Sequence, residues 1–216
     1  MTDKPIIFSA PMVQALLTGR KTQTRRLLKG RSGIIAARSV IQNGLHWLAI
    51  EYDRSWPLRL PYAPGDRLYV REAFCPRLGY PAAIAKPHYR ADDDKPEWRG
   101  LWKPSIHMPR WASRLTLTVT EVRVQRLQEI SEADAVAEGV AEVSAAWQDA
   151  DEPATYPSFQ AYGQDACFSG AGAARLSFMT LWSSLHGPDA WATNPWVVAV
   201  SFAVQNGNID AVKPNA

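Results

Sequence analysis

The spacing of hydrophobic and polar positions predicts three helices. Apolar residues at helical spacing predict a short helix over residues 9–19, with Pro11 in its first turn and Gly19 at its end. A capping-box pattern that begins at Ser131 predicts a second helix as far as Glu138. The third helix, over residues 174–185, is amphipathic, and its predicted apolar face consists of Leu176, Met179, Leu181, Trp182 and Leu185.

Alternating patterns predict strands between these helices. The predicted strands cover residues 21–26, 46–50, 67–72, 114–124 and 195–202. The run over 114–124 alternates most regularly and is expected to be a central strand. The chain is therefore predicted to be α+β, a small mixed β-barrel with flanking helices and loop insertions.

The 216 residues fit a single domain over residues 1–206. Weakly patterned or Pro-, Gly- and acid-rich segments interrupt the predicted elements, and we expect insertions at about 30–60, 76–100 and 142–172. Residues 207–216 are expected to form a flexible tail.

Composition excludes several classes of protein and site. With two cysteines, neither a disulfide framework nor a Cys-rich zinc site is expected, and the four histidines show no metal-binding spacing. We therefore expect no metal and no cofactor. The absence of a secretory leader pattern and of a long apolar run predicts a cytoplasmic protein with no membrane partner.

Charge is unevenly distributed, although the formal net charge is only +3. Residues 1–31 carry seven Lys and Arg residues against Asp3 alone, whereas residues 127–170 carry nine acidic residues and no Lys or Arg. This asymmetry predicts a basic face and an acidic flank, and solvated loops are the alternative interpretation of the acidic stretch.

The basic segment over residues 19–26 is the first candidate site. Its sequence is Gly-Arg-Lys-Thr-Gln-Thr-Arg-Arg, and its cations would attract a phosphate or another anion. Neighbouring cations disfavour the protonated form of Lys21, which could then act as a general base for the Thr24 hydroxyl. A regular strand would place Lys21 and Thr24 on opposite faces, so a turn or bulge would have to bring them together. An edge strand protected by charge is the structural alternative.

A second candidate site is the segment over residues 102–114, where aromatic and cationic side chains alternate. Such a segment can stack on bases and pair with phosphates; its candidate binding residues are Trp102, Lys103, His107, Arg110 and Trp111. The alternative is that the tryptophans fill the core beneath a long loop.

Two glutamates are candidates for proton transfer. Glu72 ends a predicted strand, and Glu138 ends a predicted helix, where the helix dipole disfavours a negative charge. An ordinary solvated glutamate is the alternative at either position.

The segment over residues 19–26 resembles the signature of the ASCH domain, a relative of the PUA domain, in which Gly-x-Lys is followed by Thr or Glu and then Arg. Four further segments are similar to a phage and prophage branch of that family, and they lie at residues 9–12, 65–72, 102–114 and 194–197. The matching segments cover about half of the chain, and the predicted insertions lie outside them.

The resemblance implies a PUA-like barrel with a cleft that acts on RNA or nucleosides. One enzyme of the family is an amidohydrolase that removes the acetyl group from N4-acetylcytidine. By similarity to it, Thr24 would be the nucleophile, Lys21 would activate it, and Glu138 would pass a proton to the leaving amine. Arg20 and Arg26 would hold a phosphate or ribose. The common ASCH pattern has Glu where this chain has Thr24, which favours the amidohydrolase type.

Other functions stay open at this point. One is a non-catalytic module that binds a nucleobase in RNA or DNA, with RNA favoured over DNA, and another is a ribonuclease. A structural role in phage assembly is a third, which rests on the family label alone. The large predicted insertions favour a substrate larger than a free nucleoside.

Overall fold

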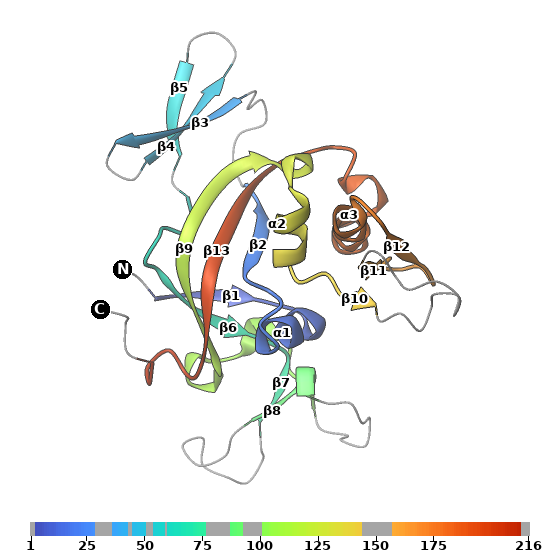
Figure 1. The fold of residues 1–216 in the computed structure, drawn as a ribbon. Helices are drawn as coiled ribbons and strands as arrows, with labels where there is room; N and C mark the ends of the chain where they lie inside the picture. The colour runs from blue at the N-terminus through green and yellow to red at the C-terminus, as the bar shows by residue number, and fades with distance from the viewer. Residues whose placement is uncertain are drawn as a thin grey trace. The chain divides into compact units, whose positions relative to one another are not determined.

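The computed structural model describes residues 3–28, 36–42, 45–50, 54–58, 60–76, 87–92, 101–143 and 157–212. It is a mixed α+β protein (Figure 1), as the sequence predicts. Its helices are α1 (Ala10–Leu17), α2 (Glu132–Ala137) and α3 (Ala173–His186). Short 3-10 helices lie at Arg90–Asp92, Ser105–His107, Arg110–Ala112, Leu127–Glu129 and Pro188–Ala190.

A five-stranded sheet has the order β1-β6-β9-β13-β2. Its strands are β1 (Asp3–Ile7), β2 (Gln23–Leu27), β6 (Arg67–Arg71), β9 (Leu115–Arg126) and β13 (Trp196–Asn206). β1 runs parallel to β6, whereas β6 pairs antiparallel with β9 and β13 pairs antiparallel with β2. β9 is central, as predicted. Among the described strands, the pairing ends at β1 and β2, so the sheet is open rather than the closed barrel that the sequence suggested.

Three smaller sheets lie in or beside the predicted insertions. β3 (Ala36–Gln42), β4 (Leu45–Ile50) and β5 (Arg54–Leu58) form an antiparallel meander in the first insertion. β7 (Phe74–Cys75) pairs with β8 (His88–Tyr89). β10 (Glu142–Val143), β11 (Ser158–Gln160) and β12 (Cys167–Ser169) form an antiparallel sheet in the third insertion.

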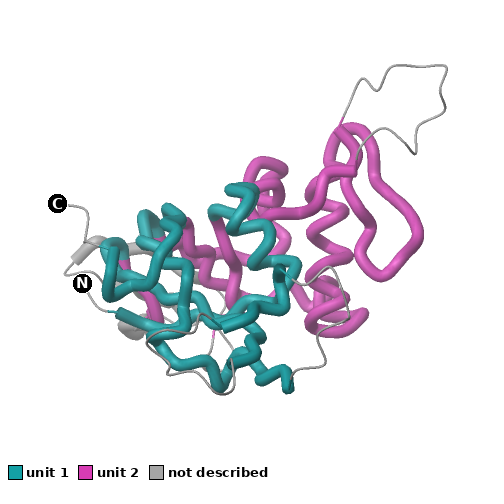
Figure 2. Tube along the Cα trace, turned by 90° about the horizontal axis from the view of Figure 1, so that it is seen from below, with its two compact units in different colours: residues 1–22, 64–121, 202–216 teal, residues 23–63, 122–201 magenta. Residues whose placement is uncertain are grey.

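The chain divides into two compact units (Figure 2), each built from separate parts of the sequence. Unit 1 consists of residues 1–22, 64–121 and 202–216. Unit 2 consists of residues 23–63 and 122–201. The long strands β9 and β13 each contribute residues to both units.

The core of unit 1 follows the predicted patterns. Met12, Val13, Ala15 and Leu16 of α1 are buried, and Gly19 has the positive φ of 74° that ends the helix. β6 alternates as predicted, with Leu68 and Val70 buried.

Part of the predicted tail packs into unit 1. Ile209 is fully buried, and the Asn208 amide donates to the carbonyls of Arg110, Trp111 and Ser113 at 2.8–3.1 Å. The Arg67 guanidinium also donates to the Val212 carbonyl. Residues 207–212 are therefore held by these contacts, and residues 213–216 lie outside the described part.

In unit 2, α3 packs against α2, β11 and β12. Its buried residues are Ala173, Ala174, Ser177, Phe178, Thr180, Leu181 and Trp182. The predicted apolar face is therefore wrong for Leu176 and Leu185, which are exposed. The small residues Ala174 and Ser177 are buried, and the Ser177 hydroxyl donates to the Gln160 carbonyl of β11 at 2.6 Å, which a hydrophobicity count does not detect.

Candidate functional site

The candidate residues Lys21, Thr24 and Glu138 are all withdrawn from solvent. Their exposed fractions are 2%, 1% and 4%. A buried amine, hydroxyl and carboxylate each require hydrogen-bonding partners, because burial of an unpaired polar group costs free energy. These positions therefore differ from a solvated, charge-protected edge strand.

Lys21 lies at the end of the α1 turn, before β2 begins. Its backbone N–H donates to the Ala15 carbonyl at 3.0 Å, and its ammonium lies 5.6 Å from the centre of the Phe8 ring. Because the strand starts only at Gln23, the strict alternation expected over residues 21–26 does not apply to Lys21. Three residues of chain also keep the Cα atoms of Lys21 and Thr24 within about 11 Å.

Thr24 and Arg26 share one face of β2. Arg26 Nη1 donates to the Thr24 hydroxyl at 2.8 Å. Burial lowers the pKa of Arg26, while the charges of Glu138 and Tyr62 oppose that effect. Accepting this bond leaves the Thr24 hydroxyl its own proton to donate, because a hydroxyl both donates and accepts.

Arg25 lies on the opposite face of β2 and binds the two carboxylates of α2. Its guanidinium contacts Glu138 Oε1 and Asp134 Oδ2, both at 3.0 Å, and its Nη1 also donates to Gln23 Oε1 at 2.6 Å. The Arg25 side chain is fully buried. The sequence analysis did not identify this residue as part of a site. Asp134 and Glu138 are four residues apart, however, and this spacing puts both carboxylates on one side of a helix.

The caps of α2 place these carboxylates as the sequence predicts. The Ser131 hydroxyl accepts from the Asp134 N–H at 3.0 Å, and Gly139 follows Glu138 with a φ of 83°. Arg123 and Gln23 also donate to Asp134 Oδ1. Burial acts to raise the pKa of Asp134, but the hydrogen bonds from Arg123 and Gln23 and the charge of Arg25 outweigh it and lower this pKa.

The basic and acidic segments of the sequence therefore meet inside unit 2. Arg25 comes from the basic segment, and Asp134 and Glu138 come from the acidic one. Part of the basic charge thus neutralises carboxylates and is not available to attract an external anion. Arg20, by contrast, is exposed, and its Nε donates to the Thr18 hydroxyl at 3.2 Å.

The second candidate segment forms a loop of unit 1 with two 3-10 helices. Trp111 is 46% exposed, Lys103 and His107 are exposed, and Trp102 is half-buried. Arg110 forms ion pairs with Asp3 and Asp210, at 2.5 and 2.6 Å. Arg110 is thus committed to carboxylates, whereas Trp111 presents a face to solvent.

The other predicted carboxylate, Glu72, lies in unit 1 and is almost fully buried. Arg114 binds it through two parallel hydrogen bonds of 2.8 and 3.0 Å, and the Arg114 guanidinium lies 4.0 Å from the centre of the Tyr89 ring. Burial raises the pKa of Glu72 despite Arg114. With Asp92 also bound to Arg114, this cluster joins β6 to the chain before β9.

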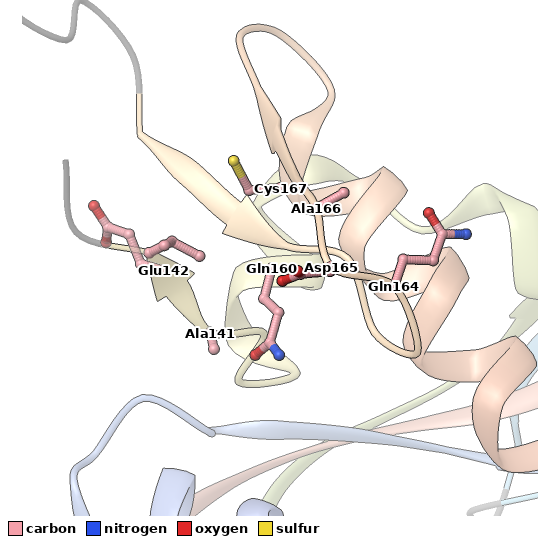
Figure 3. Close-up of a pocket in the computed structure, with 8 residues that line it drawn as sticks. Ala141, Glu142, Gln160, Gln164, Asp165, Ala166 and Cys167 are labelled. Atoms are coloured by element: carbon pink, nitrogen blue, oxygen red, sulfur yellow. The ribbon is translucent and has the colours of Figure 1, made fainter. Parts of the chain in front are cut away.

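Two of the pockets that the described residues form belong to unit 2. The first, of about 490 Å³, is formed by β10, β11, the turn after β11 and the start of β12 (Figure 3). Its lining residues are Ala141, Glu142, Val143, Gln160, Gln164, Asp165, Ala166 and Cys167. The second, of about 520 Å³, lies at the carboxyl end of α3 and is lined by Trp182 and His186 together with Leu27 of β2.

Within the described ranges, no group of three or more His, Cys, Asp and Glu side chains could hold a metal ion. In the same part of the chain, no helix combines the length and apolar character needed to cross a membrane.

Comparison with known proteins gives no relative. No family model, no curated protein and no solved structure matches the chain.

Proposed function

We propose that this protein is an ASCH-type, PUA-like hydrolase that acts on a modified nucleoside, free or within RNA. Specifically, it removes the acyl group from an N4-acylated cytidine. The observation that carries the proposal is the buried Thr24 hydroxyl, hydrogen-bonded to Arg26 at 2.8 Å in the segment that resembles the family signature. Burial favours such chemistry because electrostatic stabilisation is stronger away from bulk water.

In the proposed reaction, the Thr24 hydroxyl attacks the acyl carbon, and Lys21 takes up its proton as the general base. The C–N bond then breaks, and Glu138 relays this same proton from Lys21 to the leaving amine. Water hydrolyses the resulting Thr24 ester, which yields the carboxylic acid and restores the hydroxyl. Arg26, already hydrogen-bonded to Thr24, stabilises the negative charge that develops on the acyl oxygen.

The pairing of Glu138 with Arg25 supports a fixed position for this carboxylate. The negative charge of Glu138 also acts to raise the pKa of Arg26, and Arg26 is the residue that donates to the Thr24 hydroxyl.

The test is acetate release from N4-acetylcytidine, free and in an RNA oligonucleotide, followed by NMR. Thr24→Val and Lys21→Met are expected to reduce release to background, and Thr24→Ser is expected to keep part of it, because only serine restores the hydroxyl. Thr22→Val is the matched control, since Thr22 is exposed and two positions away. Failure of the wild-type protein to release acetate from either substrate would refute the proposal.

A second candidate function is nucleic-acid binding without chemistry, and the exposure of Trp111 favours it. Base stacking on an exposed aromatic ring is worth about 1–3 kcal/mol. Binding of single-stranded RNA should then weaken steeply with salt and fall about tenfold or more in Trp111→Ala. The exposed Leu185, in unit 2, provides the control substitution Leu185→Ala. Cleavage of the RNA in the same assay would indicate a ribonuclease instead.

A further inference from the structure

The first pocket of unit 2 is built by one small sheet. It occupies about 490 Å³, and its lining residues lie on or beside β10, β11, β12 and the turn that joins β11 to β12. Pockets for small organic ligands typically occupy about 300–1,000 Å³. All of the lining residues belong to unit 2, so the pocket lies within one compact unit.

Hydrogen bonds to α3 hold the backbone of this pocket in place. The Tyr162 hydroxyl accepts from the Ala141 N–H at 2.9 Å, and the Tyr162 N–H donates to the Thr180 hydroxyl of α3 at 2.9 Å. The Ser177 hydroxyl, also on α3, donates to the Gln160 carbonyl at 2.6 Å. The pocket is therefore formed before a ligand arrives, which lowers the entropy cost of binding.

The polar side chains of the pocket accept hydrogen bonds at several separate positions. Glu142 and Asp165 contribute carboxylates, which are acceptor-only when ionised, and Gln160 and Gln164 contribute amide oxygens. Figure 3 shows Glu142 on β10 at one side of the pocket and Gln164 at the other, with Gln160 between them. No Lys or Arg occurs in residues 127–170. The lining therefore favours a cation whose donors are spread along its length.

The two carboxylates of the pocket differ from the other acidic groups of this segment. Neither the Glu142 nor the Asp165 carboxylate has a hydrogen bond or ion pair with another described residue. The other described carboxylates of residues 127–170 all accept hydrogen bonds from the protein itself, and they are those of Glu129, Glu132, Asp134 and Glu138. The uncompensated negative charge of this part of the chain thus lies at the pocket.

An organic cation fits this lining better than a metal ion does. Glu142, Asp165 and Cys167 all line the pocket, but no three such groups in the described ranges are close enough to hold a metal ion. Ala141, Val143 and Ala166 add apolar surface for methylene groups. Two separate carboxylates match two ammonium point charges on a flexible chain, whereas the planar guanidinium fork matches a single carboxylate.

We infer that this pocket binds a linear aliphatic polyamine, with one ammonium group at Glu142, another at Asp165, and the methylene chain over Ala141, Val143 and Ala166. The inference goes beyond the proposed function and does not depend on it, because none of the proposed reacting residues lines this pocket.

The experiment titrates the full chain with spermidine, followed by calorimetry and by NMR of the glutamine side-chain amides. Binding should be saturable, and butylamine, which has a single ammonium group, should bind about tenfold more weakly. Glu142→Gln and Asp165→Asn should each weaken spermidine binding about threefold, because both carboxylates are exposed. The double variant should weaken it about tenfold. Ala166→Trp, which fills the pocket without changing its charge, should also weaken binding.

The matched control is Asp189→Asn, which removes the same charge from an exposed position of unit 2 outside this pocket. It should leave spermidine binding unchanged, and Mg²⁺ at equal charge should not displace spermidine. The inference is wrong if Asp189→Asn weakens binding as much as Asp165→Asn does, if Mg²⁺ displaces spermidine, or if no saturable binding occurs. Acetate release from N4-acetylcytidine should be the same in Asp165→Asn as in the wild-type protein, so this inference and the hydrolase proposal can fail separately.

Discussion

At the scale of single residues, the main feature of unit 2 is the burial of charge. Arg25 is enclosed by Asp134, Glu138 and Gln23, and its guanidinium lies 5.8 Å from the centre of the Phe178 ring. Because charges removed from water need compensation, this cluster must form as a unit. It therefore determines where β2 lies against α2.

The Arg25→Met substitution should lower the free energy of unfolding by about 3–5 kcal/mol, because it leaves buried carboxylates without their guanidinium. Urea denaturation measures the change. Arg20→Ala is the control and should stay within about 0.5 kcal/mol, since Arg20 is exposed.

The double variant Arg25→Met with Glu138→Met sharpens this test. Replacing Arg25 together with Glu138 removes one of the two carboxylates that Arg25 neutralises, and Arg123 still donates to the other, Asp134, so the double variant should recover part of the stability that the single variant loses. If Arg25→Met lowers the free energy of unfolding by less than about 1 kcal/mol, the ionic cluster around Arg25 does not stabilise the fold.

At the scale of elements, a side chain from another segment accepts hydrogen bonds from the free N–H groups at the start of α3. The N-cap residue of α3 is Gly172, which has no side chain to accept a hydrogen bond from the first turn. The Glu132 carboxylate of α2 instead accepts from the N–H groups of Ala174 and Arg175, at 2.7 and 3.1 Å. A negative charge at this end also complements the helix dipole.

Glu132→Ala should therefore destabilise α3 by about 0.5–2 kcal/mol, the usual cost of losing an N-terminal cap. Glu132→Gln should lose less, since an amide oxygen can still accept one bond. Hydrogen exchange at Ala174 and Arg175 reads out the effect locally. Unchanged protection at both amides in Glu132→Ala would contradict the capping role.

The loop that carries Trp111 depends on Asn208. One amide group donates to three carbonyls of residues 110–113, and Asn208 Oδ1 accepts from the Asp210 N–H. Without this amide, the half-buried carbonyl of Ser113 would lose the Asn208 hydrogen bond, and the carbonyl of Arg110 would keep only the Ser113 N–H.

Asn208→Ala should therefore cost about 1–3 kcal/mol and increase hydrogen exchange over residues 110–113. Asn206→Ala is the control, because Asn206 is exposed at the end of β13. If both variants exchange alike, the loop does not depend on Asn208.

At the scale of the whole molecule, each unit has its own ionic cluster. In unit 1, Arg67 binds Asp3 with two hydrogen bonds of 3.0 Å, and Arg110 binds the same carboxylate. The hydrogen bond from Arg67 is the largest of the influences that lower the pKa of Asp3 below its ordinary value of 3.8. Asp3 thus contributes stability above that value, and this contribution is lost as the pH falls through the lower pKa of the folded state.

Asp3→Asn should therefore destabilise the protein at neutral pH, by about 1 kcal/mol, and the difference should shrink as the pH falls below 3.8 and through the lower pKa of the folded state. Urea midpoints measured across this pH range test it. Asp165→Asn is the exposed control and should show no such convergence. A difference that stays constant with pH would rule out the ion pair as its cause.

The linear sequence by itself determined the local elements and the residue types that carry chemistry. Turn glycines, the Ser131 cap and period-two alternation act over a few residues, so α1, α2, β6 and β9 could be predicted. Lys21, Thr24 and Glu138 became candidates through the charge of the basic segment, the predicted helix end and the resemblance to the ASCH signature, and their roles stay predictions.

Only the tertiary structure decided which charges meet and which stay exposed. The pairing of Arg25 with Asp134 and Glu138 joins residues more than 100 positions apart, and so does the Arg110–Asp3 pair. The tertiary structure also decided which face of α3 is buried, because α2, β11 and β12 pack against that face. Burial and pairing are properties of the folded arrangement, because neither the neighbours nor the local dielectric of a side chain is encoded in its adjacent residues.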